Sequence, residues 1–164
     1  MSRSTAAALP VPTTPAQIRN VVLVGPSGGG KSTLFDRLVH GELLRRKEDE
    51  GASTALRVAT IGHGELAITL LDTPGASDFV GEVRAGLRAA DAALFVIAAG
   101  SSVDEASRML WRECAAVGMP RAVALTKLEQ CQDDYATVVE ASRRALRASR
   151  SFSPICGASL RRIS

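Results

Sequence analysis

The stretch that decides the fold is Gly25-Pro26-Ser27-Gly28-Gly29-Gly30-Lys31-Ser32. Its spacing matches the GxxxxGK[ST] pattern of a phosphate-binding loop. An apolar, β-branched run at residues 20–24 precedes it and predicts a buried strand. Residues 32–40 follow it with Leu34, Phe35 and Leu38 at helical spacing. Because this motif requires a strand before it and a helix after it, we favour a phosphate-binding loop over a glycine-rich linker.

This loop has the chemistry to hold a polyphosphate. Glycines allow the backbone to curl until successive N–H groups point at the same phosphate oxygens, and the helix adds the partial positive charge of its N-terminus. Lys31 is expected to reach the β- and γ-phosphates, and Ser32 to give its hydroxyl to Mg²⁺. The predicted nucleotide-binding residues of this segment are Gly25, Pro26, Ser27, Gly28, Gly29, Gly30, Lys31, Ser32 and Thr33.

Strands and helices alternate along the rest of the chain. Such alternation predicts an α/β domain with a mostly parallel sheet of six strands and helices on both faces. One pair of strands, joined by a turn at Gly62-His63-Gly64, is expected to be an antiparallel hairpin. Ligands of such sheets bind beyond the carboxyl ends of the strands. The expected strands are 20–24, 55–61, 66–71, 92–98, 121–125 and 153–156, and the expected helices are 32–40, 79–90, 103–117 and 133–149.

Length and composition suit one globular domain. The chain has 164 residues, of which 46% are hydrophobic and 23% charged, and its net charge of +3 does not require a nucleic-acid partner. Three widely spaced cysteines support neither a disulfide framework nor a zinc site, which fits the cytoplasm. We expect a monomer with no membrane or DNA partner. The expected organisation is a disordered tail at 1–17, a nucleotide-binding domain at 18–160 and a short tail at 161–164.

A second motif, Asp72-Thr73-Pro74-Gly75, follows an apolar strand. Asp72 is placed to hold Mg²⁺, through water, as a Walker-B acid does. Gly75 can bring a backbone N–H close to the γ-phosphate, so Lys31 and Gly75 are the predicted catalytic residues. Standing alone, this sequence would be read as a plain turn. About 40 residues after a phosphate-binding loop, the functional interpretation is favoured.

The segment Thr126-Lys127-Leu128-Glu129 resembles the [NT]-K-x-D motif with which GTPases read guanine. In that motif a carboxylate accepts hydrogen bonds from guanine N1–H and N2–H₂, and the Lys stem lies along the base. Here Glu129 replaces the usual Asp and lengthens the contact by one methylene. Thr126, Lys127 and Glu129 are therefore the predicted base readers. Ala158 and Ser159 resemble the fifth GTPase motif, although an ordinary C-terminal tail explains them equally well.

Taken together, these residues resemble the GTP-binding domain of the translational GTPase family, in particular elongation factor G and its elongation-factor-G-like branch in actinobacteria. The resemblance covers residues 19–147 and implies a Ras-like G domain of the P-loop NTPase class, with GTP and Mg²⁺ as cofactors. It also implies GTPase activity in protein biosynthesis. Three stretches beyond the nucleotide motifs carry it, and they are Ala76-Ser77-Asp78-Phe79 with Glu82-Val83, Trp111-Arg112, and Val117-Gly118-Met119-Pro120-Arg121.

The sequence departs from the family pattern in three places. Ala76 stands where the family has a His that positions the attacking water, so we expect slow hydrolysis. The loop at 41–54 is shorter than in the family, and the Mg²⁺-binding Thr of that loop aligns with Ser53 or the adjacent Thr54. The further domains of elongation factor G are absent from the chain, so translocation by that mechanism is not expected.

Other functions stay open at this point. The chain can be a GTPase switch, a GTP-binding module that recruits a partner without turnover, a P-loop kinase or ATPase, or a fragment of a longer elongation factor. A contact with the ribosome or its RNA is conceivable through basic residues near one helical face, but a solvated helix face explains them more simply. These residues are Arg143, Arg144, Arg147 and Arg150.

Overall fold

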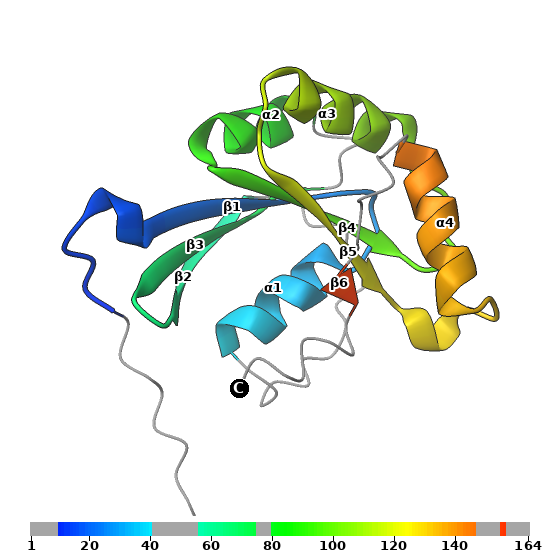
Figure 1. Ribbon diagram of the computed structural model, residues 1–164, viewed down its shortest axis with the longest axis horizontal. Coiled ribbons are helices and arrows are strands. Elements are labelled where there is room, and N and C mark those ends of the chain that lie inside the picture. Colours follow the sequence, from blue (N-terminus) through cyan, green and yellow to red (C-terminus); the bar gives the residue numbers. More distant parts are fainter. Residues whose placement is uncertain (1–9, 41–55, 75–79, 147–154, 157–164) are drawn as a thin grey trace, which may run out of the picture.

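The computed structural model describes residues 10–40, 56–74, 80–146 and 155–156, which form a sheet flanked by helices (Figure 1). Its strands lie in the order β2-β3-β1-β4-β5-β6. The last strand is only two residues long and pairs with β5. The strands are β1 (Ile18–Val24), β2 (Arg57–His63), β3 (Leu66–Asp72), β4 (Ala92–Ala98), β5 (Arg121–Thr126) and β6 (Ile155–Cys156).

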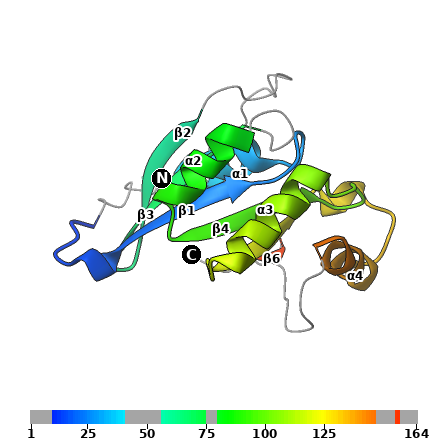
Figure 2. The same cartoon turned by 90° about the horizontal axis from the view of Figure 1, so that it is seen from above.

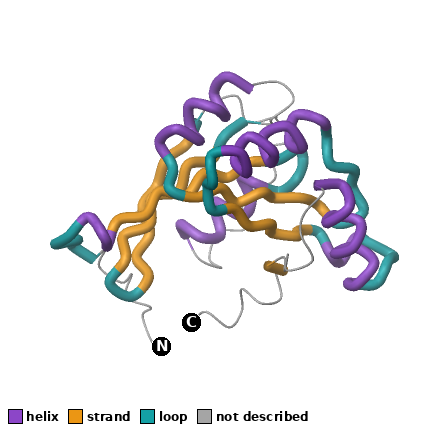
Figure 3. Tube along the Cα trace, turned by 45° about the horizontal axis from the view of Figure 1, so that its top comes forward, coloured by secondary structure: helices purple, strands orange, loops and turns teal. Residues whose placement is uncertain are grey.

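Helices cover both faces of this sheet, as expected. Viewed in Figures 1 and 2, α2 and α3 lie side by side over one face, whereas α1 lies under the other. Figure 3 shows the strands as a middle layer between these helices. No helix among the described residues is long and apolar enough to cross a membrane. The helices are α1 (Lys31–His40), α2 (Val80–Ala89), α3 (Glu105–Ala116) and α4 (Tyr135–Leu146), with 3-10 turns η1 (Pro15–Gln17) and η3 (Leu128–Gln130).

The strand pairing confirms the mostly parallel sheet and its antiparallel hairpin. β1 runs parallel to β3 and β4, β5 runs parallel to β4 and β6, and β2 is antiparallel to β3. The hairpin turn was expected at Gly62-His63-Gly64, and that position is wrong. Pairing continues to His63 opposite Leu66, so the turn consists of Gly64 and Glu65. Gly64 has φ +58, a conformation that glycine adopts without steric cost.

Other boundaries differ by a few residues from the sequence expectation. β1 begins at Ile18 because the preceding η1 turn, inside the stretch expected to be disordered, directs the chain into the sheet. In that turn the side chain of Gln17 accepts hydrogen bonds from the backbone N–H groups of Thr13 and Thr14, at 2.7 and 3.0 Å. Residues 1–9, the expected loop at 41–54 and the tail at 161–164 lie outside the described residues.

A hydrophobic core lies on each face of the sheet, between the strands and the helices that cover them. In the larger core, Phe95 on β4 meets Trp111 on α3 edge to face, with ring centroids 5.0 Å apart. The smaller core packs α1 against the opposite face and consists of Leu23, Leu34, Phe35, Leu70, Val96 and Ala124. The larger core contains residues of α2, α3 and α4, including Val83, Leu87, Leu110, Trp111, Val138 and Leu146. Successive β4 residues thus serve opposite cores, as the pleat of a strand requires.

Helix α3 shows how the sequence sets the ends of an element. Asp104 is its N-cap and accepts a 2.7 Å hydrogen bond from the backbone N–H of Ser107. At the other end the N–H groups of Gly118 and Met119 donate to the carbonyls of Ala115 and Cys114, at 3.1 and 2.9 Å. This is a Schellman motif, and Gly118 with φ +68 occupies its left-handed position. The expected stop at Gly118 is confirmed.

Thr73 ties two parallel strands together next to the expected ligand edge. Its side chain has no exposure, and its hydroxyl donates a 2.6 Å hydrogen bond to the carbonyl of Leu23. We expect Thr73→Val to lower the free energy of unfolding by about 1–3 kcal/mol, because a buried acceptor loses its donor without a change in shape. Urea denaturation followed by circular dichroism measures this loss.

The control is Thr60→Val on the edge strand. The hydroxyl of Thr60 is exposed and meets that of Thr69 at 3.2 Å. Removing it should change stability by no more than about 0.5 kcal/mol. An equal loss of unfolding free energy in the two variants would show that the Thr73 hydrogen bond stabilises the fold no more than the exposed Thr60 contact.

Candidate nucleotide-binding site

Four strands bring the predicted motifs to one edge of the sheet. The phosphate-binding loop follows β1, Asp72 ends β3 and Thr126 ends β5, and β4 lies between β1 and β5 in the sheet. All four strands run in the same direction, so their carboxyl ends meet at this edge. The edge is the expected position for a ligand in a sheet of this topology.

The phosphate-binding loop is folded tightly against β4. At Gly25, with φ +152, an added Cβ would lie 2.3 Å from the carbonyl oxygen of Val96. The N–H of Gly29 donates to the carbonyl of Pro26 at 3.2 Å, which closes the turn. The first α1 bond runs from the N–H of Leu34 to the carbonyl of Gly30, at 2.9 Å. The first turn of a helix has N–H groups without intrahelical acceptors, and in α1 this turn directly follows the loop.

Lys31 lies inside this loop. Its side chain is buried, with 6% exposure, and its ammonium group donates to the carbonyls of Gly25 and Pro26 at 3.0 and 2.9 Å. Burial lowers the pKa of Lys31, and the negative charges of Asp72 and Asp104 offset part of that effect. The loop thus holds a partly desolvated cation at its centre, which an entering phosphate group would stabilise.

Ser32 and Asp72 meet where the sequence predicts a Mg²⁺ site. The Ser32 hydroxyl donates to Oδ2 of Asp72 at 3.0 Å, and Asp72 is fully buried. The second oxygen of that carboxylate, Oδ1, is buried without a hydrogen-bond partner among the described residues. A hydroxyl and a carboxylate oxygen are the hard donors that Mg²⁺ takes. The residues therefore fit the ion.

The described part of the chain has no group of three or more His, Cys, Asp or Glu side chains that could hold a metal ion. The other predicted metal ligands, Ser53 and Thr54, lie outside the described residues.

Arg57 is a site residue that the sequence analysis missed. It stands opposite Asp72 in the hairpin register, and its Nε and Nη2 donate to Oδ2 of Asp72 at 3.1 and 2.6 Å. Its Nη1 donates to Oδ1 of Asp36 at 3.0 Å, and its guanidinium lies 4.6 Å from the centre of the Phe35 ring. Burial lowers the pKa of Arg57, but the bonds and charges of Asp72 and Asp36 outweigh it and leave the pKa raised. The sequence signal that could have identified Arg57 is the pairing register of the β2–β3 hairpin, which depends on the position of its turn.

Thr126 makes a contact that the sequence analysis did not predict. Its hydroxyl donates to the carbonyl of Gly29 at 2.7 Å, across 97 residues of sequence. The same oxygen is 3.3 Å from the carbonyl of Ile97. This side chain therefore fastens the phosphate-binding loop to the end of β5.

The other predicted base readers lie on the surface just beyond β5. Lys127 has φ +54, and it is the only described residue other than glycine with a positive φ. A non-glycine residue in this conformation is strained, and such strain concentrates at functional sites. Glu129 lies in the η3 turn and is exposed.

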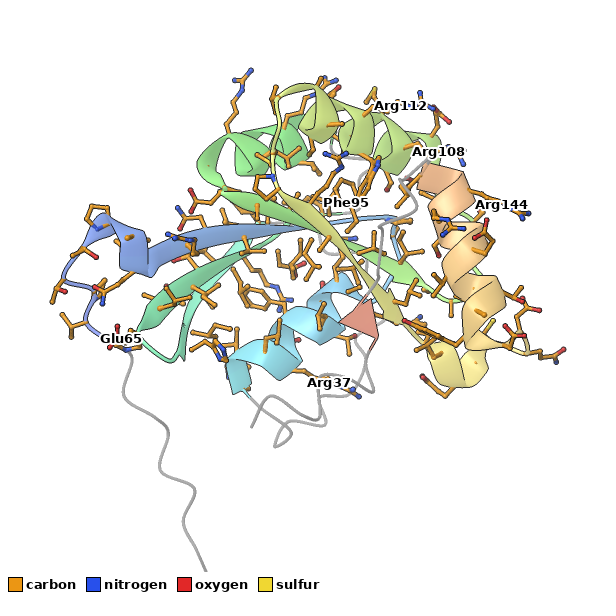
Figure 4. The ribbon with its side chains drawn as sticks, viewed as in Figure 1. Arg37, Glu65, Phe95, Arg108, Arg112 and Arg144 are labelled. Carbon is orange, nitrogen blue, oxygen red and sulfur yellow. The ribbon has the colours of Figure 1, made fainter. Side chains whose placement is uncertain are left out.

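The remaining predicted residues fall into two groups. Gly75, Ala158 and Ser159, together with Ala76, lie outside the described residues. Of the basic residues considered for RNA contact, Arg143 and Arg144 both pair with Glu140 on their own helix. Arg144 extends away from the sheet in Figure 4.

The chain matches known proteins along nearly all of its length. A sequence model of the family described as "Elongation factor Tu GTP binding domain" matches residues 16–162. The elongation factor G-like protein of Mycobacterium tuberculosis is 48% identical, over 85% of this chain and 22% of that protein. A crystal structure of a Thermus thermophilus protein has TM-score 0.69 and 34% identity, covering 80% of this chain and 22% of that one.

Era, solved with MgGDPNP and part of 16S ribosomal RNA, has TM-score 0.68 and 19% identity over 85% of this chain and 51% of Era. At this identity the similarity shows a shared fold and nothing finer. The chain spans only about a fifth, 22%, of the length of the first curated relatives.

The close approach at Gly25 predicts that this position tolerates no side chain. Gly25→Ala should lower the free energy of unfolding by about 2 kcal/mol or more, because the methyl group would collide with the Val96 carbonyl. Urea denaturation is again the measurement. In the control, Gly81→Ala in α2, the new methyl meets nothing within 4 Å. That variant should be neutral or stabilised by up to about 1 kcal/mol. A neutral Gly25→Ala would contradict the described loop.

Proposed function

The chain belongs to the family of the elongation factor Tu GTP-binding domain, and from that premise we propose that it binds GTP with Mg²⁺ and hydrolyses it slowly. The observation that carries the proposal is the buried Lys31 ammonium, held by the Gly25 and Pro26 carbonyls at the start of α1. A polyphosphate would stabilise a buried cation at the N-terminus of a helix, where the helix carries a partial positive charge. The whole protein's role in translation is a further proposal, since the chain spans about one fifth of its relatives' length.

Roles for the site residues follow from this proposal. Lys31 would neutralise charge on the β- and γ-phosphates, and Ser32 and Asp72 would hold Mg²⁺, which would neutralise charge on phosphate oxygens. Gly75 would offer its N–H to the γ-phosphate, and Ser53 or Thr54 would add a hydroxyl. With Ala76, the chain has no side chain at that position to orient the attacking water.

Guanine selectivity is assigned to Glu129 and Lys127. The carboxylate would accept from guanine N1–H and N2–H₂, and adenine offers no such pair of donors. Ala158 and Ser159 would lie beside the base. The exposed position of Glu129, one turn beyond β5, supports this role because the side chain is free of competing ion pairs in the described structure. ATP should therefore compete poorly with GTP.

Lys31→Met tests the phosphate contact. The variant keeps the side-chain stem and removes the charge, so GTP and GDP affinity should fall roughly tenfold to a hundredfold, as for lost charge-assisted hydrogen bonds. Calorimetry with GTP, GDP and ATP, with and without Mg²⁺, measures it. Arg37→Ala is the control, because Arg37 lies on the same helix and extends away from the sheet (Figure 4). A folded native chain that binds no nucleotide would end the proposal.

Hydrolysis is tested by single-turnover cleavage of radiolabelled GTP. Without a residue to orient water, the rate should be on the order of 10⁻³ s⁻¹, as for unassisted GTPases. Asp72→Asn serves as a control for contaminating enzymes, because it should remove the residual activity. Turnover of many per second in the native chain would overturn the slow-hydrolysis proposal.

A second candidate function is a GTP-binding module that recruits a partner without useful turnover. Ala76 favours it, whereas Lys31, Ser32 and Asp72 favour an enzyme. Tight binding with no phosphate release would select the module. A ribosomal RNA contact stays a prediction, and a salt-dependent ribosome pelleting assay would test it.

A further inference from the structure

Arg57 places a fixed positive charge directly on the carboxylate that would serve Mg²⁺. Oδ2 of Asp72 receives two bonds from the guanidinium, from Nε at 3.1 Å and from Nη2 at 2.6 Å. It also accepts the Ser32 hydroxyl at 3.0 Å. Oδ1 of the same carboxylate has no partner among the described residues. All the cationic contact is thus concentrated on one oxygen.

The guanidinium cannot easily leave this position. Asp36 on α1 holds Nη1 at 3.0 Å, the Ser32 carbonyl lies 3.4 Å from Nη2, and the Phe35 ring covers the guanidinium plane at 4.6 Å. Residues of α1 and β3 therefore hold the guanidinium of Arg57, which lies on β2, in one position. The planar fork of arginine suits this double contact.

We propose that Arg57 is a resident cation of the Mg²⁺ site, one that keeps Asp72 and Ser32 in place without metal and lowers the affinity for Mg²⁺. This inference rests on the proposed nucleotide-binding function. The Ser32 hydroxyl can continue to donate its hydrogen bond to Asp72 while its oxygen lone pairs face a metal. Oδ1 stays available as well. The ion would therefore enter beside Arg57, and repulsion between the two cations weakens its binding.

A purely structural role is the alternative. Arg57 occupies the first of the inward-facing positions of edge strand β2, which continue with Ala59 and Ile61. Inward-pointing charges on edge strands discourage pairing with other chains. In that case Arg57 would affect stability or aggregation, and its removal would weaken nucleotide binding equally with and without metal.

The experiment compares nucleotide affinity in EDTA and across a Mg²⁺ titration, using a fluorescent GDP analogue. Arg57→Gln and Arg57→Met both remove the charge, and Met retains the stem over Phe35. We expect both variants to bind nucleotide more weakly in EDTA, because a bare carboxylate then faces the phosphates. We also expect the Mg²⁺ concentration for half-saturation to fall about tenfold, a size typical of coupling between sites. Arg57→Lys keeps the charge and should stay close to the native chain in the Mg²⁺ titration.

The control variant is Arg84→Gln, which removes another arginine–carboxylate pair, with Glu113, between α2 and α3. It should leave the Mg²⁺ titration unchanged. If the native chain binds nucleotide and the two charge-removing variants show the same Mg²⁺ half-saturation as the native chain, the resident-cation proposal is wrong. A Lys variant that behaves like Gln would also overturn it. Failure of the native chain to bind any nucleotide would instead remove the proposed function.

Discussion

The carboxylate of Asp72 has no exposure to solvent, and this buried charge constrains the whole ligand edge. An ion taken out of water costs several kcal/mol unless partners compensate it. Here the partners come from three sources: Ser32 from α1, Arg57 from β2, and the positive charge of Lys31, whose pKa is lowered by burial, an effect that Asp72 partly offsets. The positions of the loop, the hairpin and the first helix are therefore linked through one carboxylate.

Two threonines extend this linkage into the sheet. Backbone groups at strand ends have no ladder partner, so side chains must satisfy them. Thr73 donates to the carbonyl of Leu23 and joins β3 to β1. Thr126 donates to the carbonyl of Gly29 and joins the end of β5 to the phosphate-binding loop.

The features that the sequence predicted share one property, which is that their determinants are local. The strand, glycine turn and helix around Lys31 are adjacent in the chain, and so is the α3 stop at Gly118. Arg57 was not predicted because its role depends on the register between β2 and β3. The turn lies at Gly64 and Glu65 instead of at the expected position, and this difference changes which residue stands opposite Asp72. The Thr126 contact was not predicted either, because its partner Gly29 is 97 residues away in the sequence.

The protein groups that hold the site together also retain unused capacity for a ligand. An ammonium group has three donors, and Lys31 gives two to the Gly25 and Pro26 carbonyls, which leaves a third for phosphate. The Ser32 hydroxyl donates its hydrogen bond to Asp72, so its oxygen lone pairs are still available. Oδ1 of Asp72 has no partner among the described residues. On the proposed function, a bound nucleotide would add contacts without breaking the existing ones. Such preorganisation saves the ordering cost that a collapsed loop would impose on the ligand.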